Sequence, residues 1–341
     1  MRIKDVAREA GVSTATVSHV INSTRFVTDE TRDKVLRAIK KCNYYPNAHA
    51  RSLASGRSKM LGLLVSDISN PFFPELVKSI ESAAFERGYD VILSETNYDA
   101  ARTSNYVRRM IERQVAGVVL MTSEMDSSLI DELANRNVSV VFLDLGSAGP
   151  HMSNLVVDYA SGIEDAIRHL VGLGHRSIAY IGGPSNLKSA VKRLEAFRAS
   201  MSRHLVDGPA PLIVEADFQL EGGRRAAGDI LLSPELPTAV VVANDMMAMG
   251  AMKEFRSAGL RIPADISIVG FDDIAFAAMA DPPLTTICLP RSELGRRAVA
   301  ALMTTIERAD LPGVEIHIAT YLIERGSTAP ARSIKLQGAA S

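Results

Sequence analysis

A short row of hydrogen-bonding side chains near the amino terminus is the most informative chemical feature of this 341-residue chain. Hydroxyl groups, an imidazole and an amide fall close together, at Ser13, Thr14, Thr16, Ser18, His19 and Asn22. Groups of these kinds donate and accept directed hydrogen bonds, and they can read the edges of DNA bases. What they do depends on the elements that hold them in one row.

Two short helices joined by a tight turn would present this row. Apolar residues recur with helical spacing on both sides of the turn, at Val6, Ala10, Val17, Val20 and Ile21. Gly11 falls where the first helix must stop, because glycine enters a left-handed cap without strain. Ser13 is well placed to cap the second helix through its side-chain oxygen. The pattern predicts a helix-turn-helix that offers its second helix to a DNA major groove.

A third helix and a linker complete this amino-terminal segment. Thr28 is the predicted N-cap of the third helix, Pro46 breaks the chain, and residues 46–58 are predicted to form a linker. Residues 1–58 carry eleven Lys and Arg against five Asp and Glu, a net charge of +6. The remainder carries 27 against 34, a net charge of −7. A basic head on an acidic body is typical of a polyanion-binding module joined to a second domain, although a solvated helix face would carry similar charge.

Composition places the chain among ordinary globular proteins. It is 47% hydrophobic and 23% charged, and its length suggests two or three domains. Its two cysteines, Cys42 and Cys288, have neither metal-ligand spacing nor a disulfide framework, which fits a reducing compartment. The amino terminus lacks the apolar segment of a signal peptide, and no apolar run approaches about 18 residues. We therefore expect a cytoplasmic protein with no membrane span, no metal and no cofactor.

After the linker, short apolar runs alternate with longer helical stretches. The predicted strands are 61–66, 91–94, 117–121, 138–143, 178–181, 212–215, 239–243, 266–270, 285–289 and 314–323. Continuous apolar strands alternating with helices predict α/β lobes with doubly wound parallel sheets covered on both faces. Two such series predict two lobes, with the chain crossing between them near 160, 290 and 323. Ligands of such sheets bind beyond the carboxyl ends of the strands, which places a site in the cleft.

At this point the residues resemble a known family, the LacI family of bacterial repressors. The resemblance is carried in order by Lys4–Ala7, Ala10–Asn22 (AGVSTATVSHVIN), Tyr45–Leu53, Ile68–Phe73, Gly172–Arg176, Ala243–Gly250, Val269–Asp273, Pro283–Ile287 and Leu322–Gly326. Within the family, Val17–Asn22 and Thr24–Val27 are most similar to the ribose- and purine-repressor branch. The resemblance implies an all-α helix-turn-helix headpiece (1–45), a hinge (46–58) and a two-lobed core resembling periplasmic binding proteins (59–341). The first lobe would comprise 59–160 and 291–322, and the second 161–290 and 323–341.

The resemblance also implies how the headpiece binds DNA. The implied contact residues are Ser13, Thr14, Ala15, Thr16, His19, Asn22, Arg25, Asn47, Arg51 and Leu53. Thr14, Ala15 and His19 would face the major groove, where Ala15 could only pack against a thymine methyl group. Ser13 and Thr16 would bind phosphate, with a purely helix-capping role as the alternative. Leu53 would wedge between base steps in the minor groove and kink the duplex.

For the core, the resemblance implies eight effector-binding residues. They are Asn70, Phe72, Phe73, Asp144, Arg193, Phe218, Asn244 and Asp272. Aromatic rings would cover the apolar faces of a sugar, and the polar groups would exchange hydrogen bonds with its hydroxyls. The alternatives are plain core for Phe72 or Phe73, strand-end caps for Asn244 and Asp272, and a solvated helix charge for Arg193.

Two departures from the family pattern bear on the effector. Leu187 stands near a position where the purine branch carries an arginine, and Leu289 stands where sugar binders commonly carry a glutamine. The polar set is therefore thinner than in a ribose site, and a pentose, a deoxy sugar and a less hydroxylated acid all stay open. A small sugar or sugar derivative, ribose-like, is the favoured effector. A purine or another metabolite is the alternative.

The assembly and the rival function classes follow from the same residues. Two-headed binding to a pseudo-palindromic operator implies a homodimer. An enzyme is disfavoured, because the stretch Ser66–Pro71 lacks the glycine-rich dinucleotide fingerprint and no hydrolase or zinc-protease motif occurs. A periplasmic sugar-binding protein would need a signal peptide and no basic head.

Overall fold

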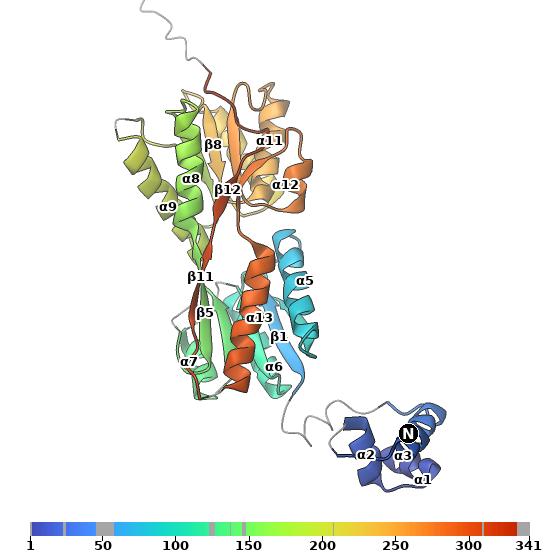
Figure 1. Ribbon diagram of the computed structural model, residues 1–341. Helices are drawn as coiled ribbons and strands as arrows, with labels where there is room; N and C mark the ends of the chain where they lie inside the picture. Colours follow the sequence, from blue (N-terminus) through green and yellow to red (C-terminus); the bar gives the residue numbers. More distant parts are fainter. Residues whose placement is uncertain are drawn as a thin grey trace, which may run out of the picture. The chain divides into compact units, whose positions relative to one another are not determined.

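The computed structural model describes residues 2–22, 25–45, 58–122, 127–136, 138–144, 148–206, 208–308 and 310–332. Internal contacts divide the chain into two compact units, Met1–Lys59 and Met60–Ser341. The first unit is all α and the second is α/β (Figure 1). Among the described helices, none is both long and apolar enough to cross a membrane.

The first unit contains three helices, α1 (Ile3–Ala10), α2 (Thr14–Asn22) and α3 (Asp29–Lys41). Their buried faces meet in a small core around Val6, Val17 and Val35. Both predicted caps of the first turn are confirmed. Gly11 ends α1 with φ of +67°, and the Ser13 hydroxyl oxygen accepts a 3.0 Å hydrogen bond from the Thr16 N–H.

The predicted cap of α3 is only partly correct. Thr28 occupies the N-cap position, but its side chain accepts no bond from the backbone of α3. Its hydroxyl instead donates to the Thr31 hydroxyl at 2.9 Å. The helix start is therefore favoured by the acids of the first turn, Asp29 and Glu30, through the helix dipole.

The second unit begins with a six-stranded parallel sheet, which we call the first lobe. Its strands, in the order β11-β5-β4-β3-β1-β2, are β1 (Met60–Val65), β2 (Asp90–Glu95), β3 (Gly117–Met121), β4 (Ser139–Leu143), β5 (Met152–Asp158) and β11 (Glu315–Ala319). Helices α5 (Phe72–Phe85) and α13 (Arg291–Glu307) pack on one face, and α6 (Ala100–Glu112) and α7 (Ser127–Asn135) on the other. The central strand β3 is buried along its whole length, as its apolar sequence predicts.

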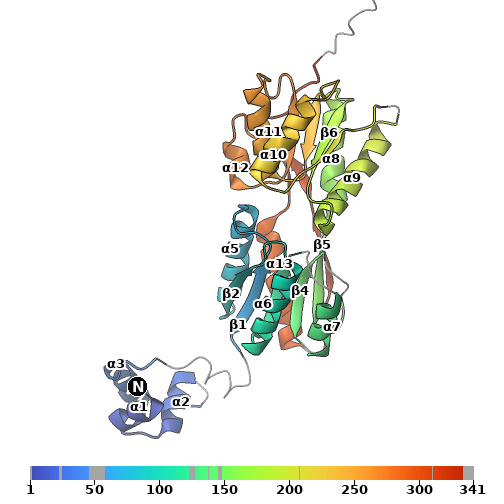
Figure 2. The same cartoon turned by 180° about the vertical axis from the view of Figure 1, so that it is seen from behind.

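The second lobe has the same plan. Its strands, in the order β12-β10-β9-β8-β6-β7, are β6 (Ile178–Gly182), β7 (Ile213–Glu215), β8 (Ala239–Val242), β9 (Ser267–Asp272), β10 (Thr285–Cys288) and β12 (Tyr321–Ile323). Its helices are α8 (Tyr159–Gly172), α9 (Lys188–His204), α10 (Leu220–Leu231), α11 (Asp245–Ser257) and α12 (Ala275–Met279). Figure 2 shows α10 and α11 side by side on this lobe. Two doubly wound lobes are thus confirmed, except that β12 runs antiparallel to its neighbour.

Three segments join the two lobes, and one of them differs from the sequence prediction. The strand predicted over 314–323 is divided at Thr320 into β11 and β12, which belong to different sheets. The crossing predicted near 323 therefore falls at Thr320. The Thr320 hydroxyl donates to the Asp158 carbonyl oxygen at 2.6 Å and accepts from the Gly162 N–H at 3.0 Å. This hydroxyl ties two of the three crossings together.

Candidate functional sites

Five of the ten predicted DNA-contacting residues lie on α2, and Ser13 directly precedes this helix. Ser13, Thr14 and Ala15 are exposed, whereas Val17 and Val20 on the opposite face are buried. Thr16 and His19 are half-buried, and Asn22 and Arg25 are exposed. Asn47, Arg51 and Leu53 lie outside the described residues, so their roles stay predictions.

Two of these polar groups already have local partners. The Ser13 hydroxyl lies 2.9 Å from the Thr16 hydroxyl, and the Asn22 amide donates to the Ser18 hydroxyl at 3.2 Å. A hydroxyl or amide of this kind retains further hydrogen-bonding capacity toward a phosphate. The capping role of Ser13 and a phosphate contact are therefore compatible.

All eight predicted effector residues line one cavity between the lobes. Its empty space, including the open mouth, is about 610 Å³. The residues come from the ends of β4, β8 and β9, from the loop after β7, and from α5 with its preceding turn and α9. Sequence reasoning did not assign several other lining residues to this site, namely Ser66, Tyr98, Met121, Thr122, Leu143, Tyr159 and Ser189. The carboxyl ends of parallel strands thus converge on a single site, as the sheet rule predicts.

A buried ion pair forms the polar centre of this cavity. Arg193 Nη2 lies 3.3 Å from Asp272 Oδ1, and both residues are less than a tenth exposed. Another guanidinium N–H donates to the Ala243 carbonyl oxygen, whereas Nε has no hydrogen-bond partner among the described residues. The guanidinium carbon lies 3.9 Å from the ring centre of Phe271, within cation–π range. An unpartnered N–H beside a carboxylate provides one donor and one acceptor for a ligand.

The environment of Asp272 alters its acidity. Burial raises the pKa of Asp272 to about 6, although the guanidinium groups of Arg193 and Arg291 act in the opposite direction. A second carboxyl group, Asp245, lies nearby and accepts from the Thr286 hydroxyl at 2.5 Å and the Ile274 N–H at 2.9 Å. Burial, and then the charge of Asp272, raise the pKa of Asp245 well above its ordinary value. These two carboxyl groups therefore oppose each other's ionisation.

Asp144 is more fully engaged than the sequence suggests. It accepts hydrogen bonds from the Tyr159 hydroxyl at 2.8 Å, the Val157 N–H at 3.1 Å and the Lys192 ammonium at 3.1 Å. Burial, followed by the Asp144 charge, raises the pKa of Tyr159 well above its usual value, so this phenol remains a donor. Lys192 belongs to the second lobe and Asp144 to the first, so the pair also joins the lobes.

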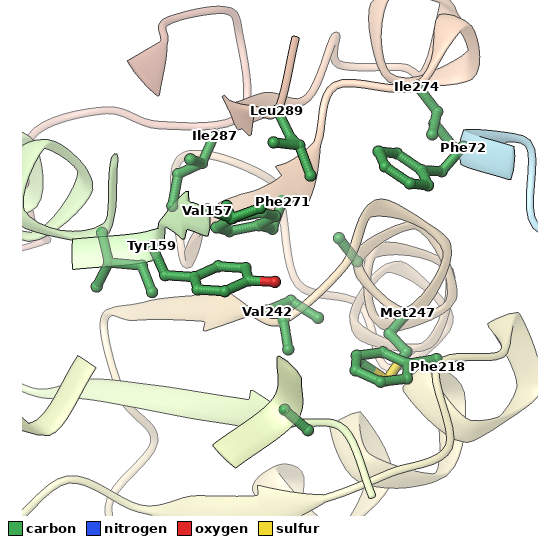
Figure 3. Packing of buried hydrophobic residues seen from close by; sticks show 14 of the residues in the cluster. Phe72, Val157, Tyr159, Phe218, Val242, Met247, Phe271, Ile274, Ile287 and Leu289 are labelled. Atoms are coloured by element: carbon green, nitrogen blue, oxygen red, sulfur yellow. The ribbon is translucent and has the colours of Figure 1, made fainter. Parts of the chain in front are cut away.

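Aromatic rings enclose the remainder of the cavity. Phe72 and Phe73 meet edge to face with ring centres 5.2 Å apart, and Phe218 stacks on Tyr98 at 6.5 Å. Figure 3 shows Tyr159 beneath Phe271, with ring centres 5.9 Å apart. Tyr98 follows β2 directly, so the rule that ligands bind at strand ends could have found it in the sequence.

The two asparagines act as structural caps at the cavity. Asn70 Oδ1 accepts from the Phe72 N–H at 3.0 Å. Asn244 caps α11 by accepting from the Met247 N–H at 2.8 Å, and its amide donates to the Phe218 carbonyl oxygen at 2.9 Å. The capping role given as the alternative for Asn244 is thus present, and contact of either side chain with an effector stays a prediction. Leu289 lines the cavity, whereas Leu187 is buried and does not belong to its lining.

Comparisons with known proteins agree with this architecture. Residues 2–47 match the family described as bacterial regulatory proteins, lacI family, and residues 167–328 match the periplasmic binding protein-like domain. A curated relative, the HTH-type transcriptional repressor PurR of Proteus mirabilis (strain HI4320), is 39% identical over 331 residues, with 96% of each chain covered.

Solved structures resemble the chain over a similar extent. A lac repressor dimer bound to operator and the anti-inducer ONPF has a TM-score of 0.85 at 30% identity, covering 96% of this chain and 99% of that one. A LacI family transcriptional regulator from Enterococcus faecium, with bound ribose, has a TM-score of 0.71 at 29% identity, covering 80% of this chain and 100% of that one.

Proposed function

The chain belongs to the lacI family of bacterial regulatory proteins, and we propose that this helix-turn-helix repressor is controlled by a small, ribose-like sugar or sugar derivative bound between its lobes. It acts on DNA in the cytoplasm and performs no catalysis of its own. The proposed DNA target is a pseudo-palindromic operator bound by a homodimer, since a solved relative is a dimer on its operator.

The proposal for the effector rests on the Arg193–Asp272 ion pair and on the aromatic side chains that line the same cavity. The Arg193 Nε–H, which has no partner in the described part of the chain, can donate to one hydroxyl oxygen, and the Asp272 carboxylate can accept from another hydroxyl. The rings of Phe72 and Phe218 line the same cavity and suit the apolar face of a sugar ring. Such a site rejects analogues without hydroxyls, because its buried polar groups would stay unpaired.

A purine effector is the second candidate. The curated relative, a repressor named PurR, favours this candidate. The aromatic side chains that line the cavity also suit a flat base. Against it, Leu187 offers no hydrogen-bonding group where the purine branch carries an arginine, and its side chain does not line the cavity.

Calorimetric titration of the full chain with ribose, other monosaccharides and hypoxanthine separates the two candidates. We expect ribose or a close derivative to bind, and Arg193→Met to weaken that binding at least tenfold, because it removes a buried charged donor. Arg198→Met is the matched control, since Arg198 lies on the same helix and is exposed. Binding of hypoxanthine without any sugar would establish the second candidate instead.

The DNA-binding half of the proposal rests on α2. We expect His19→Ala to weaken binding to the operator in the protein's own upstream DNA by about 1–3 kcal/mol, with little change on unrelated DNA. Fluorescence anisotropy at fixed salt measures both affinities. His317→Ala, an exposed histidine in the second unit, is the control. Equal losses on both DNAs would assign His19 to phosphate rather than to a base.

A further inference from the structure

A short loop of the second lobe reaches across to the first lobe at the cavity. It follows β7 and contains Asp217, Phe218 and Gln219. The Gln219 side-chain amide donates to Asp67 Oδ2, at the end of β1, with a distance of 2.8 Å. Beside this bond, the Phe218 ring stacks on Tyr98 of the first lobe. One hydrogen bond and one ring contact therefore connect this loop with the opposite lobe.

Each partner of the hydrogen bond is fixed within its own lobe. Asp67 is buried, and its other oxygen accepts from the Ser69 N–H at 2.8 Å and the Ser69 hydroxyl at 2.6 Å. In the second lobe, Asp217 accepts from the Gln219 N–H at 2.9 Å and from Arg225 at 2.7 Å. Because both groups are already held in place, little conformational entropy is lost when this hydrogen bond forms. Most of its free energy therefore contributes to holding the lobes together.

The loop also packs tightly on its own lobe. A methyl group at Gly183 would overlap the Phe218 ring, and one at Gly222 would overlap the Asp217 carboxylate. Phe218 itself has φ of +65°, in the left-handed region. The loop therefore moves with the second lobe, and opening of the cleft must break the Gln219–Asp67 bond.

Neither Gln219 nor Asp67 lines the cavity, whereas Phe218 and Tyr98 do. We propose that Gln219 and Asp67 form a clasp that positions Phe218 over the effector and holds the lobes closed without touching the effector. A clasp of this kind raises the population of the closed form, and apparent affinity follows that population. The role in effector retention rests on the proposed function, whereas the role in closure does not.

Closure is measured on the full, effector-free protein. Spin labels at Glu112→Cys in the first lobe and Glu235→Cys in the second report the distance between the lobes. Both positions are exposed, and both native cysteines are buried. Gln219→Glu places a carboxylate against the Asp67 carboxylate, so we expect a shift to longer distances. Adding Asp67→Asn restores a donor–acceptor pair of reversed polarity, so we expect the original distance to return.

Arg261→Gln is the matched control for the spin-label experiment. It removes the ion pair of a largely exposed arginine with Asp265, which lies wholly within the second lobe and outside this loop, and we expect the wild-type distance. The clasp is refuted if Gln219→Glu leaves the distance unchanged, or if the Asp67→Asn partner substitution fails to restore it.

Release kinetics test effector retention with ribose and hypoxanthine as probes. For whichever probe binds, Gln219→Ala should raise the dissociation rate constant of the probe roughly three- to tenfold. The order of affinities among different sugars should stay unchanged. A change in preference would place Gln219 in the binding site itself and overturn the proposal. If neither these probes nor the other monosaccharides bind, the proposed effector class fails, and the spin-label distances still decide the clasp.

Discussion

Asp272 carries opposing influences that give a testable pH dependence. Its pKa is raised to about 6 by burial, although Arg193 lies within ion-pair distance. The ionised Asp272 carboxylate accepts hydrogen bonds from effector hydroxyl groups. Protonation removes its negative charge, which weakens both these hydrogen bonds and the ion pair with Arg193. Effector binding therefore favours the ionised form.

We predict that effector affinity falls as pH drops through about 6 and is level above pH 7. At pH 5 about a tenth of Asp272 is ionised, so affinity should be about tenfold lower than at pH 8. Calorimetric titration from pH 5 to 8 measures this. Asp272→Asn should bind weakly with no such step, and a level wild-type profile would contradict the prediction.

The sequence located the cavity residues better than it located their partners. Asn244 and Asp272 follow or end apolar strands, and strand ends of a parallel sheet meet at one edge, so their convergence was predictable. The three donors of Asp144 were not, because Lys192 and Tyr159 reach it only once the two lobes face each other. Such contacts between lobes leave no periodic signal in the sequence.

The crossing segments were the hardest elements to predict. Residues 314–323 form one stretch with the pattern of an extended strand, and hydrophobic periodicity cannot show where a strand leaves one sheet for another. The strand β5 and the helix α8 after it were likewise not predicted, although together they make the first crossing. The division at Thr320 depends on hydrogen bonds that its hydroxyl donates to the Asp158 carbonyl oxygen and accepts from the Gly162 N–H, and both partners are distant in sequence.

Close packing at this crossing predicts a stability effect at Gly162. A methyl group there would overlap Ile287 and Thr320, so we expect Gly162→Ala to destabilise the core by about 1–3 kcal/mol. Gly172→Ala, at the other end of α8, meets no neighbouring atom within 4 Å and should be neutral or stabilising. Thermal unfolding of the two variants provides the measurement. Equal unfolding temperatures would show that the residues around Gly162 can shift to accommodate the methyl group, and would contradict the prediction.

In the whole molecule, a DNA-binding unit and an effector-binding unit share one chain, and we expect binding of one ligand to be coupled to binding of the other. If an effector changes operator affinity by some factor, the operator must change effector affinity by the same factor. We expect this factor to lie between about 5 and 150, typical of a coupling of 1–3 kcal/mol. Its direction distinguishes induction from corepression.

Two titrations test this reciprocity. Operator affinity is measured by anisotropy with and without saturating effector, and effector affinity by calorimetry with and without saturating operator. We predict equal factors for the wild-type protein. For His19→Ala we predict weaker operator binding with an unchanged factor, because the proposed role of His19 is a base contact in the DNA-binding unit. Unequal factors would mean that the effector also acts through another equilibrium, such as dimer dissociation. The titrations would then have to be analysed with protein concentration as an additional variable.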